Sequence, residues 1–357
     1  MRNRFVKVKG TNISLNATRI TELAEAGDPL MQTTLGMMIL SKTLPLRRRE
    51  EGVTWLKRAA EGGDPLGMYV LARAYGVEGE LDPDGSEARM WMERSAKAGH
   101  PAAQAEYGMS LLDEGADIDQ VDYWVTSAFN GGDCRGVYAL GSHLVKSNPP
   151  ESDDYRYGVM KLTNAAFGGI SDATMELVGV YLNDDNRFMA ARLLRKASSQ
   201  DHPLANYILG TLLVRGTPYI EKDQTEAFAL LSRSMEQGCR EAGWTLGSMY
   251  LYGVGVEVDP GKALGLLADG YENDHPISIL NLGVMFLEGI GVEKDPEIAA
   301  NLFQRASELG SREATNNLGV MYAVGIGIPR DLDRAEKLFR EAADEGEPNA
   351  EINIGLL

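Results

Sequence analysis

Few side chains in this chain could do acid–base or metal chemistry, and its four histidines are the first to consider. Three of them, His100, His202 and His275, stand directly before a proline. A polar residue followed by proline is typical of the start of a helix, where proline fits the first helical position. The fourth, His143, has only Cys134 within reach as a second ligand, so we expect no metal site. No serine or cysteine is spaced with a histidine as a nucleophile and its base, and no catalytic residue is predicted.

Glycine pairs such as Gly253-Val254-Gly255-Val256 could be mistaken for loops that hold a phosphate. None is followed by the Gly-Lys-Ser/Thr of a nucleotide-binding loop, and each recurs at one place in a longer repeat. They are better interpreted as turns that end one helix, in which a valine side chain makes an apolar contact. Asp259-Pro260 then starts the next helix, and no cofactor is expected.

A leucine–glycine step, or a close variant of it, recurs about every 36 residues. A fixed period of this size predicts a solenoid of repeats whose stacked neighbours supply the core. The steps are Leu35-Gly36, Leu71-Ala72, Tyr107-Gly108, Leu140-Gly141, Val178-Gly179, Leu209-Gly210, Leu246-Gly247, Leu282-Gly283, Leu318-Gly319 and Ile354-Gly355.

The clearest repeat runs from Arg240 to about Asp274 and contains two helical patterns. The first pattern has a small residue where a neighbouring helix must approach closely, and consists of Ala242, Leu246, Gly247 and Tyr250. The second consists of Ala263, Leu266, Leu267 and Gly270. The next two repeats follow the same plan, around Gly283 and Gly319.

These motifs resemble the Sel-like repeat family, a branch of the tetratricopeptide-like helical repeats. The resemblance implies an all-α fold, a right-handed superhelical solenoid of antiparallel helix pairs whose first helices line the concave face. It also implies protein–protein assembly far more often than catalysis. We expect an N-terminal cap and leading helix over residues 1–28, nine helix-pair repeats over 29–347 and a partial tenth repeat over 348–357.

Composition limits the partners and the location. The formal charge of −17 argues against a nucleic-acid surface, which needs a concentrated basic footprint. Residues 1–11 are too short and too interrupted for the apolar core of a signal peptide, and no apolar run is long enough to insert into a membrane. Cys134 and Cys239 lie three repeats apart and are interpreted as buried thiols in a reducing compartment. The sequence therefore predicts a cytoplasmic protein, and we expect a bacterial one.

The resemblance also suggests where a partner binds. In tetratricopeptide-like arrays the residue three before the motif glycine, and the one just after it, point from the first helix into the groove. The first of these positions holds Thr33, Tyr69, Ala105, Tyr138, Glu176, Tyr207, Trp244, Leu280, Asn316 and Ile352. Aromatic side chains are common among binding hot spots. Alternatively, some of these rings pack against the adjacent helix.

Cations lie on or beside the same inferred face, although the chain is acidic. Arginine binds carboxylates through two parallel hydrogen bonds and stacks on aromatic rings, so this face suits an acidic extended peptide. Solvated helix surface is the alternative for each cation, Lys146 included. The predicted partner-binding residues are Tyr69, Arg73, Arg135, Tyr138, Tyr207, Arg215, Trp244 and Tyr252.

The sequence thus favours a non-catalytic scaffold or adaptor that binds another protein, or an acidic extended peptide, in its concave groove. One alternative is a hydrolase of a minority Sel-like type. Another is an inhibitory or structural partner in a secretion or envelope system. A further expectation concerns residues 348–357, where Ile352 and Leu356 lack a following helix. This apolar end predicts a homodimer through the C-terminal end, and the alternatives are burial by another chain or a longer array of repeats.

Overall fold

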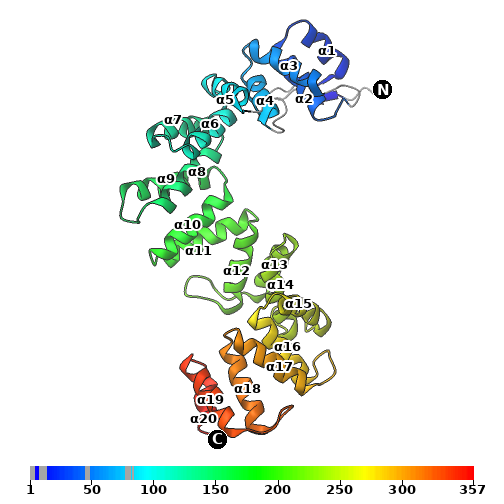
Figure 1. Ribbon diagram of the computed structural model, residues 1–357, viewed down its shortest axis with the longest axis vertical. Helices are drawn as coiled ribbons and strands as arrows, with labels where there is room; N and C mark the ends of the chain where they lie inside the picture. The colour runs from blue at the N-terminus through cyan, green and yellow to red at the C-terminus, as the bar shows by residue number, and fades with distance from the viewer. Residues whose placement is uncertain (1–4, 8–13, 45–48, 77–81, 83) are drawn as a thin grey trace. The chain divides into compact units, whose positions relative to one another are not determined.

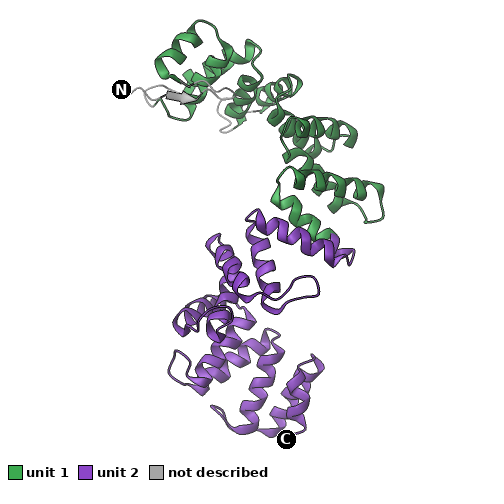
Figure 2. Cartoon of the chain, turned by 180° about the vertical axis from the view of Figure 1, so that it is seen from behind, with its two compact units in different colours: residues 1–180 green, residues 181–357 purple. Residues whose placement is uncertain are grey.

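The computed structural model describes residues 5–7, 14–44, 49–76, 82 and 84–357. The chain divides into two compact units, unit 1 from Met1 to Val180 and unit 2 from Tyr181 to Leu357 (Figure 2). Most of the N-terminal segment 1–11 lies outside the described residues.

Unit 1 begins with a short antiparallel hairpin that the all-helical prediction missed. Strand β1 (Phe5–Lys7) pairs with β2 (Ser14–Asn16), with Val6 opposite Leu15. The run Phe5-Val6-Lys7-Val8 contains aromatic and β-branched residues that favour a strand. The helices that follow are α1 (Ala17–Glu25), α2 (Pro29–Leu40), α3 (Arg49–Glu61), α4 (Pro65–Gly76), α5 (Ser86–Lys97), α6 (Pro101–Asp113), α7 (Ile118–Asn130), α8 (Arg135–Ser147), α9 (Asp153–Phe167) and α10 (Ser171–Asn183).

Unit 2 continues with helices of 13 residues each and ends with a helix of seven (Figure 1). They are α11 (Arg187–Ser199), α12 (Pro203–Arg215), α13 (Gln224–Glu236), α14 (Arg240–Tyr252), α15 (Pro260–Glu272), α16 (Pro276–Glu288), α17 (Pro296–Glu308), α18 (Arg312–Val324), α19 (Leu332–Asp344) and α20 (Pro348–Ile354).

Consecutive helices pack in pairs within each unit. In unit 1, α2 packs on α3, α4 on α5, α6 on α7 and α8 on α9. In unit 2, the pairs are α12 with α13, α14 with α15, α16 with α17, and α18 with α19. We call the even-numbered member of each pair the first helix and the odd-numbered member the second helix. The predicted helical-repeat solenoid is thereby confirmed, whereas the division into 1–28, 29–347 and 348–357 remains a prediction.

Most motif glycines lie where the two helices of a pair approach closely, whereas Gly179 on α10 has open space where a Cβ would be. A Cβ atom added at Gly283 would lie 2.5 Å from the ring of Phe303, and one at Gly319 would lie 2.7 Å from the ring of Phe339. Both rings are fully buried. The close approach predicted from the leucine–glycine step is therefore confirmed, because no larger side chain fits there.

The predicted helix caps are also confirmed. The Asp259 carboxylate accepts the backbone N–H of Lys262 at 3.0 Å, and Pro260 occupies the first helical position. His100, His202 and His275 each accept a backbone N–H three residues later through Nδ1, at 3.3 Å. Gly253 ends α14 in the left-handed conformation, with φ +67°.

Candidate binding face on the first helices

In unit 1, three predicted site residues converge on one glutamate of the next first helix. The Tyr69 hydroxyl on α4 donates to Glu106 Oε1 on α6 at 2.7 Å. Arg73, one turn further along α4, contacts the same oxygen at 3.0 Å. Arg135 on α8 reaches it from the other side at 3.3 Å. The sequence predicted the three outer residues but not the carboxylate that joins them.

These contacts set the electrostatics of the Glu106 cluster. The hydrogen bond with the Tyr69 hydroxyl and the charge of Glu106 raise the pKa of the Arg73 guanidinium. The carboxylate of Asp133, 2.7 Å from Arg135 Nη2, raises the pKa of the Arg135 guanidinium well above its usual range. Both cations are already paired with acidic groups of the same chain, and both remain about half exposed.

A second cluster in unit 1 is built in the same way around Glu176 on α10. Its Oε1 atom accepts from the Tyr138 hydroxyl at 3.2 Å, from Ser142 Oγ at 2.9 Å and from Lys146 Nζ at 2.8 Å. Burial, followed by the charge of Glu176, raises the pKa of Tyr138 to about 12. The other oxygen, Oε2, is buried without a hydrogen-bond partner among the described residues.

In unit 2, Trp244 is fixed by its neighbours. Its indole N–H donates to Asp269 Oδ2 on α15 at 2.7 Å, and its ring stacks on His275 with ring centres 4.6 Å apart. Tyr69 stacks on His100 in the same way, at 4.7 Å. A large ring three residues before the motif position thus lies against the histidine cap of the next first helix.

Tyr252, at the end of α14, also contacts the next first helix. Its hydroxyl donates to Asn281 Oδ1 on α16 at 3.0 Å, and Asn281 Nδ2 donates to Ser248 Oγ at 2.7 Å. The ring of Tyr252 remains 54% exposed. Asn281 and Glu106 occupy the same place, two residues before the motif glycine, and act as acceptors in both units.

The two other predicted residues lie on α12. Tyr207 is half-buried, and burial raises its pKa. Arg215, at the end of the helix, is exposed and pairs with no carboxylate among the residues that the structure describes. Eight positions separate the two, which is about 12 Å along a helix axis.

The position three residues before the motif glycine was expected to point into the groove. This expectation is wrong where the position holds one of the smaller residues. Thr33 and Ala105 are fully buried, and Leu280 and Asn316 are only 6% exposed. At this position a short side chain is covered by the adjacent first helix, and only a long ring extends past it. These four residues therefore do not line a groove. The alternative that some rings pack against the adjacent helix is consistent with the stacking of Tyr69 on His100 and of Trp244 on His275.

One serine–histidine contact escaped the sequence analysis. Ser278 Oγ lies 2.9 Å from His275 Nδ1. Ser278 is fully buried, and its backbone N–H is the group that His275 caps. The three-residue spacing is that of a helix cap, and the hydroxyl is not accessible to a substrate.

Sequence reasoning also missed a buried cation on the second helices of unit 1. Lys161 on α9 is buried and forms an ion pair with Asp122 on α7. Its ammonium group also donates to Thr126 Oγ1 at 2.9 Å, and the Tyr157 hydroxyl donates to Asp122 at 2.8 Å. The sequence analysis did not single out Lys161, because its partners Asp122 and Thr126 lie on the second helix of the preceding pair.

The described part of the chain offers neither a metal site nor a membrane-spanning helix. No group of three histidine, cysteine or acidic side chains there could hold a metal ion. No helix in that part is both long and apolar enough to cross a membrane. Cys134 and Cys239 are free thiols and are half-buried rather than buried, because they precede α8 and α14 at exposed helix starts.

Comparison with known proteins identifies the family. The Sel1 repeat model matches more than half of the chain, at residues 46–64, 65–100, 179–202, 203–239, 244–275, 276–311 and 312–347. The structure is similar to that of c5321, described as a protective antigen present in uropathogenic Escherichia coli strains displaying an SLR fold. The TM-score is 0.77 at 26% identity, over 96% of this chain and 74% of the other.

A curated relative is the uncharacterized protein NMB1327 of Neisseria meningitidis serogroup B, 27% identical over 186 residues. The match covers 51% of this chain and 38% of the relative, so the chain spans well under half of that protein. The helix pairs, their glycine contacts and the matched repeats together lead to one conclusion: this chain belongs to the Sel1 repeat family.

Proposed function

We propose that this protein is a non-catalytic scaffold that binds a segment of another protein along its first helices. Proteins of the Sel1 repeat family are generally protein-interaction scaffolds. The observation that carries the proposal is that the aromatic side chains on these helices are held in place before any partner arrives.

Trp244 and Tyr138 illustrate this preorganisation. Each has its polar atom hydrogen-bonded to a carboxylate of a neighbouring helix, and Trp244 is stacked on a histidine ring as well. A side chain that is already fixed loses little conformational entropy when a partner binds to it. Fixed aromatic rings are therefore suited to act as hot spots.

The finer proposal is an acidic extended peptide as the partner. Arg215 pairs with no carboxylate among the described residues, and the half-exposed Arg73 and Arg135 pair with Glu106, whose side chain is 22% exposed. Because both guanidinium groups remain about half exposed, a partner carboxylate can pair with them alongside Glu106. The net charge of −17 supports a protein rather than a nucleic acid as the partner.

We also propose that the protein is bacterial and cytoplasmic. The relatives from Neisseria and Escherichia support a bacterial source, and the two free thiols support a reducing compartment. The protective antigen among its relatives supports the alternative of an exported or envelope protein. Fractionation of the source cell distinguishes the two locations.

A homodimer through α20 is a separate part of the proposal. Ile352 is 63% exposed and Leu356 is 78% exposed, which supports a contact with a second copy. Light scattering over a wide concentration range tests it. We expect a dimer that the variant Ile352→Glu/Leu356→Glu abolishes, whereas a wild-type mass that stays monomeric contradicts it.

The main test is selection of binding peptides from a random display library on the immobilised full chain. Recovered peptides are labelled, and their affinity is measured by fluorescence polarisation against wild type, Trp244→Ala and Tyr138→Ala. We expect at least one variant to lose about 10-fold or more in affinity, as truncation of a hot spot does. Tyr123→Ala is the matched control, because Tyr123 is an exposed ring on second helix α7. Peptides that bind all variants equally would refute the proposed face.

A further inference from the structure

Unit 2 carries a pair of exposed aromatic rings, one on α11 and one in the loop that follows α12. Phe188 on second helix α11 is 54% exposed, and Tyr219 in the α12–α13 loop is 52% exposed. Their ring centres are 6.3 Å apart, in an edge-to-face arrangement. The rings come from separate elements and meet while both remain open to solvent.

The loop is built to present Tyr219. It runs from Gly216 to Asp223, one residue longer than the equivalent turn from Gly253 to Asp259. Thr217 forms a bridge with Ile220, which is almost fully buried. Thr217 Oγ1 also accepts the backbone N–H of Tyr219 at 3.3 Å. Ile220 anchors the loop, and the longer turn holds Tyr219 outside it.

Helix α11, which carries Phe188, is basic, although the acidic residues Asp184, Asp185 and Glu221 lie close to the two rings in the sequence. Helix α11 carries Arg187, Arg192, Arg195 and Lys196, and no acidic residue, in a protein of net charge −17. The guanidinium of Arg192 lies over the Phe188 ring, 5.8 Å from its centre. Arg192 pairs with no carboxylate in the described residues.

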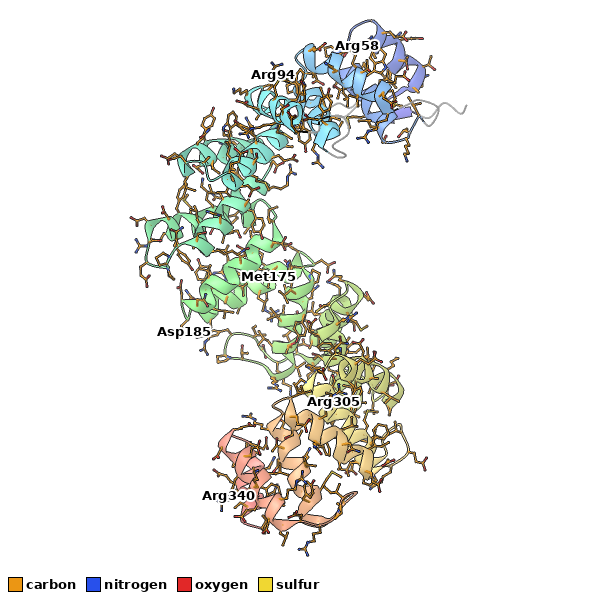
Figure 3. The ribbon with its side chains drawn as sticks, viewed as in Figure 1. Arg58, Arg94, Met175, Asp185, Arg305 and Arg340 are labelled. Carbon is orange, nitrogen blue, oxygen red and sulfur yellow. The ribbon has the colours of Figure 1, made fainter. Side chains whose placement is uncertain are left out.

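Two other cations of α11 have exposed partners. Arg187 contacts Asp185, at the turn before the helix (Figure 3), at 2.9 Å. Arg195 contacts Glu226 at 3.4 Å. Both pairs are exposed and therefore weak. The carboxylate of Asp223, which follows Tyr219, caps α13 instead.

We infer that Phe188, Arg192 and Tyr219 form a second docking surface, for an acidic peptide segment of a partner protein that carries an aromatic or aliphatic side chain. The apolar side chain would lie against the two rings, and a carboxylate would pair with Arg192. This surface combines α11 with the loop that follows α12, and it contains neither Trp244 nor Tyr138. An anionic membrane is the less favourable occupant, because the charge of the whole chain opposes approach to it.

The test uses the full chain and a display library of acidic peptides that contain tryptophan or leucine. Peptides that bind wild type are then passed over the double variant Phe188→Ala/Tyr219→Ala, and those that also bind this variant are discarded. The affinity of the remaining peptides is measured by fluorescence polarisation. We expect about a 10-fold or greater loss of affinity for Phe188→Ala and Tyr219→Ala. Arg192→Gln should weaken binding and reduce its dependence on salt. Both rings are more than half exposed, so helicity and melting temperature should not change.

Two controls separate this surface from others. Trp244→Ala should still bind these peptides. Failure of the second docking surface is therefore distinguishable from failure of the first-helix proposal. Tyr123→Ala tests whether loss of any exposed ring has the same effect. Recovery of no peptide that depends on Phe188 and Tyr219 overturns the inference. Binding to phosphatidylserine vesicles that depends on Phe188, without peptide binding, overturns it as well.

Discussion

The turn that ends α14 is the most sensitive place to test the repeat geometry. Gly255 has φ +69°, where an L-residue costs about 1–2 kcal/mol. A Cβ added there would lie 2.1 Å from the carbonyl oxygen of Gln224, at the start of α13. Relieving such an overlap typically costs a further 1–3 kcal/mol or so. Gly255→Ala should therefore lower the free energy of unfolding by about 2–5 kcal/mol.

The matched control is Gly265→Ala, in the same repeat. Gly265 lies in the middle of α15, is exposed, and has open space where a Cβ would be. Alanine there should raise stability by about 0.5–1 kcal/mol, because glycine is unfavourable in a helix. Both variants are measured by urea unfolding followed by far-ultraviolet circular dichroism. Equal stability of Gly255→Ala and wild type would refute the left-handed turn packed against α13.

Two further predictions concern buried groups. Lys161→Ala should cost about 1.5–3 kcal/mol in urea unfolding, because it removes the cation of Asp122, which keeps only its hydrogen bonds from Tyr157 and Thr126. The double variant with Asp122→Ala should lose less than the sum of the two single losses, and additive losses would contradict the ion pair. Burial lowers the pKa of His275, so the folded state favours the neutral ring that caps α16. His275 makes its full contribution to the free energy of unfolding at pH values above the ordinary histidine pKa of about 6.5. That contribution is lost as the pH falls through the lower pKa that His275 has in the folded state. Thermal melting of wild type and His275→Asn across this pH range should show that the melting temperature of the variant falls less as the pH is lowered. Identical pH profiles for the two proteins would refute the role of the neutral His275 ring as a helix cap.

Local chemistry in the sequence was sufficient to predict the architecture. The spacing of Gly247, Gly283 and Gly319, with the Asp-Pro step at Asp259, determines where helices approach and where they begin. The hairpin of β1 and β2 was missed because each strand is only three residues long.

The binding face was only partly predictable, because burial there depends on the neighbouring repeat. A single register could not distinguish Tyr69 on α4, which stays partly exposed, from Ala105 on α6, which is fully buried and lies close to Gly136 on α8. The acceptors Glu106 and Asn281 recur two residues before the motif glycine. Their role emerges only once the adjacent helices are in place.

Photo-crosslinking tests the central claim, binding along the first helices, most directly. A peptide selected on wild type, and still bound by the Phe188→Ala/Tyr219→Ala variant, is given a benzophenone group and crosslinked to the full chain. Mass spectrometry then identifies the residues reached. We predict crosslinks on first helices, such as α4, α8 and α14. Crosslinks confined to second helices, such as α7, α9 and α15, would contradict the account.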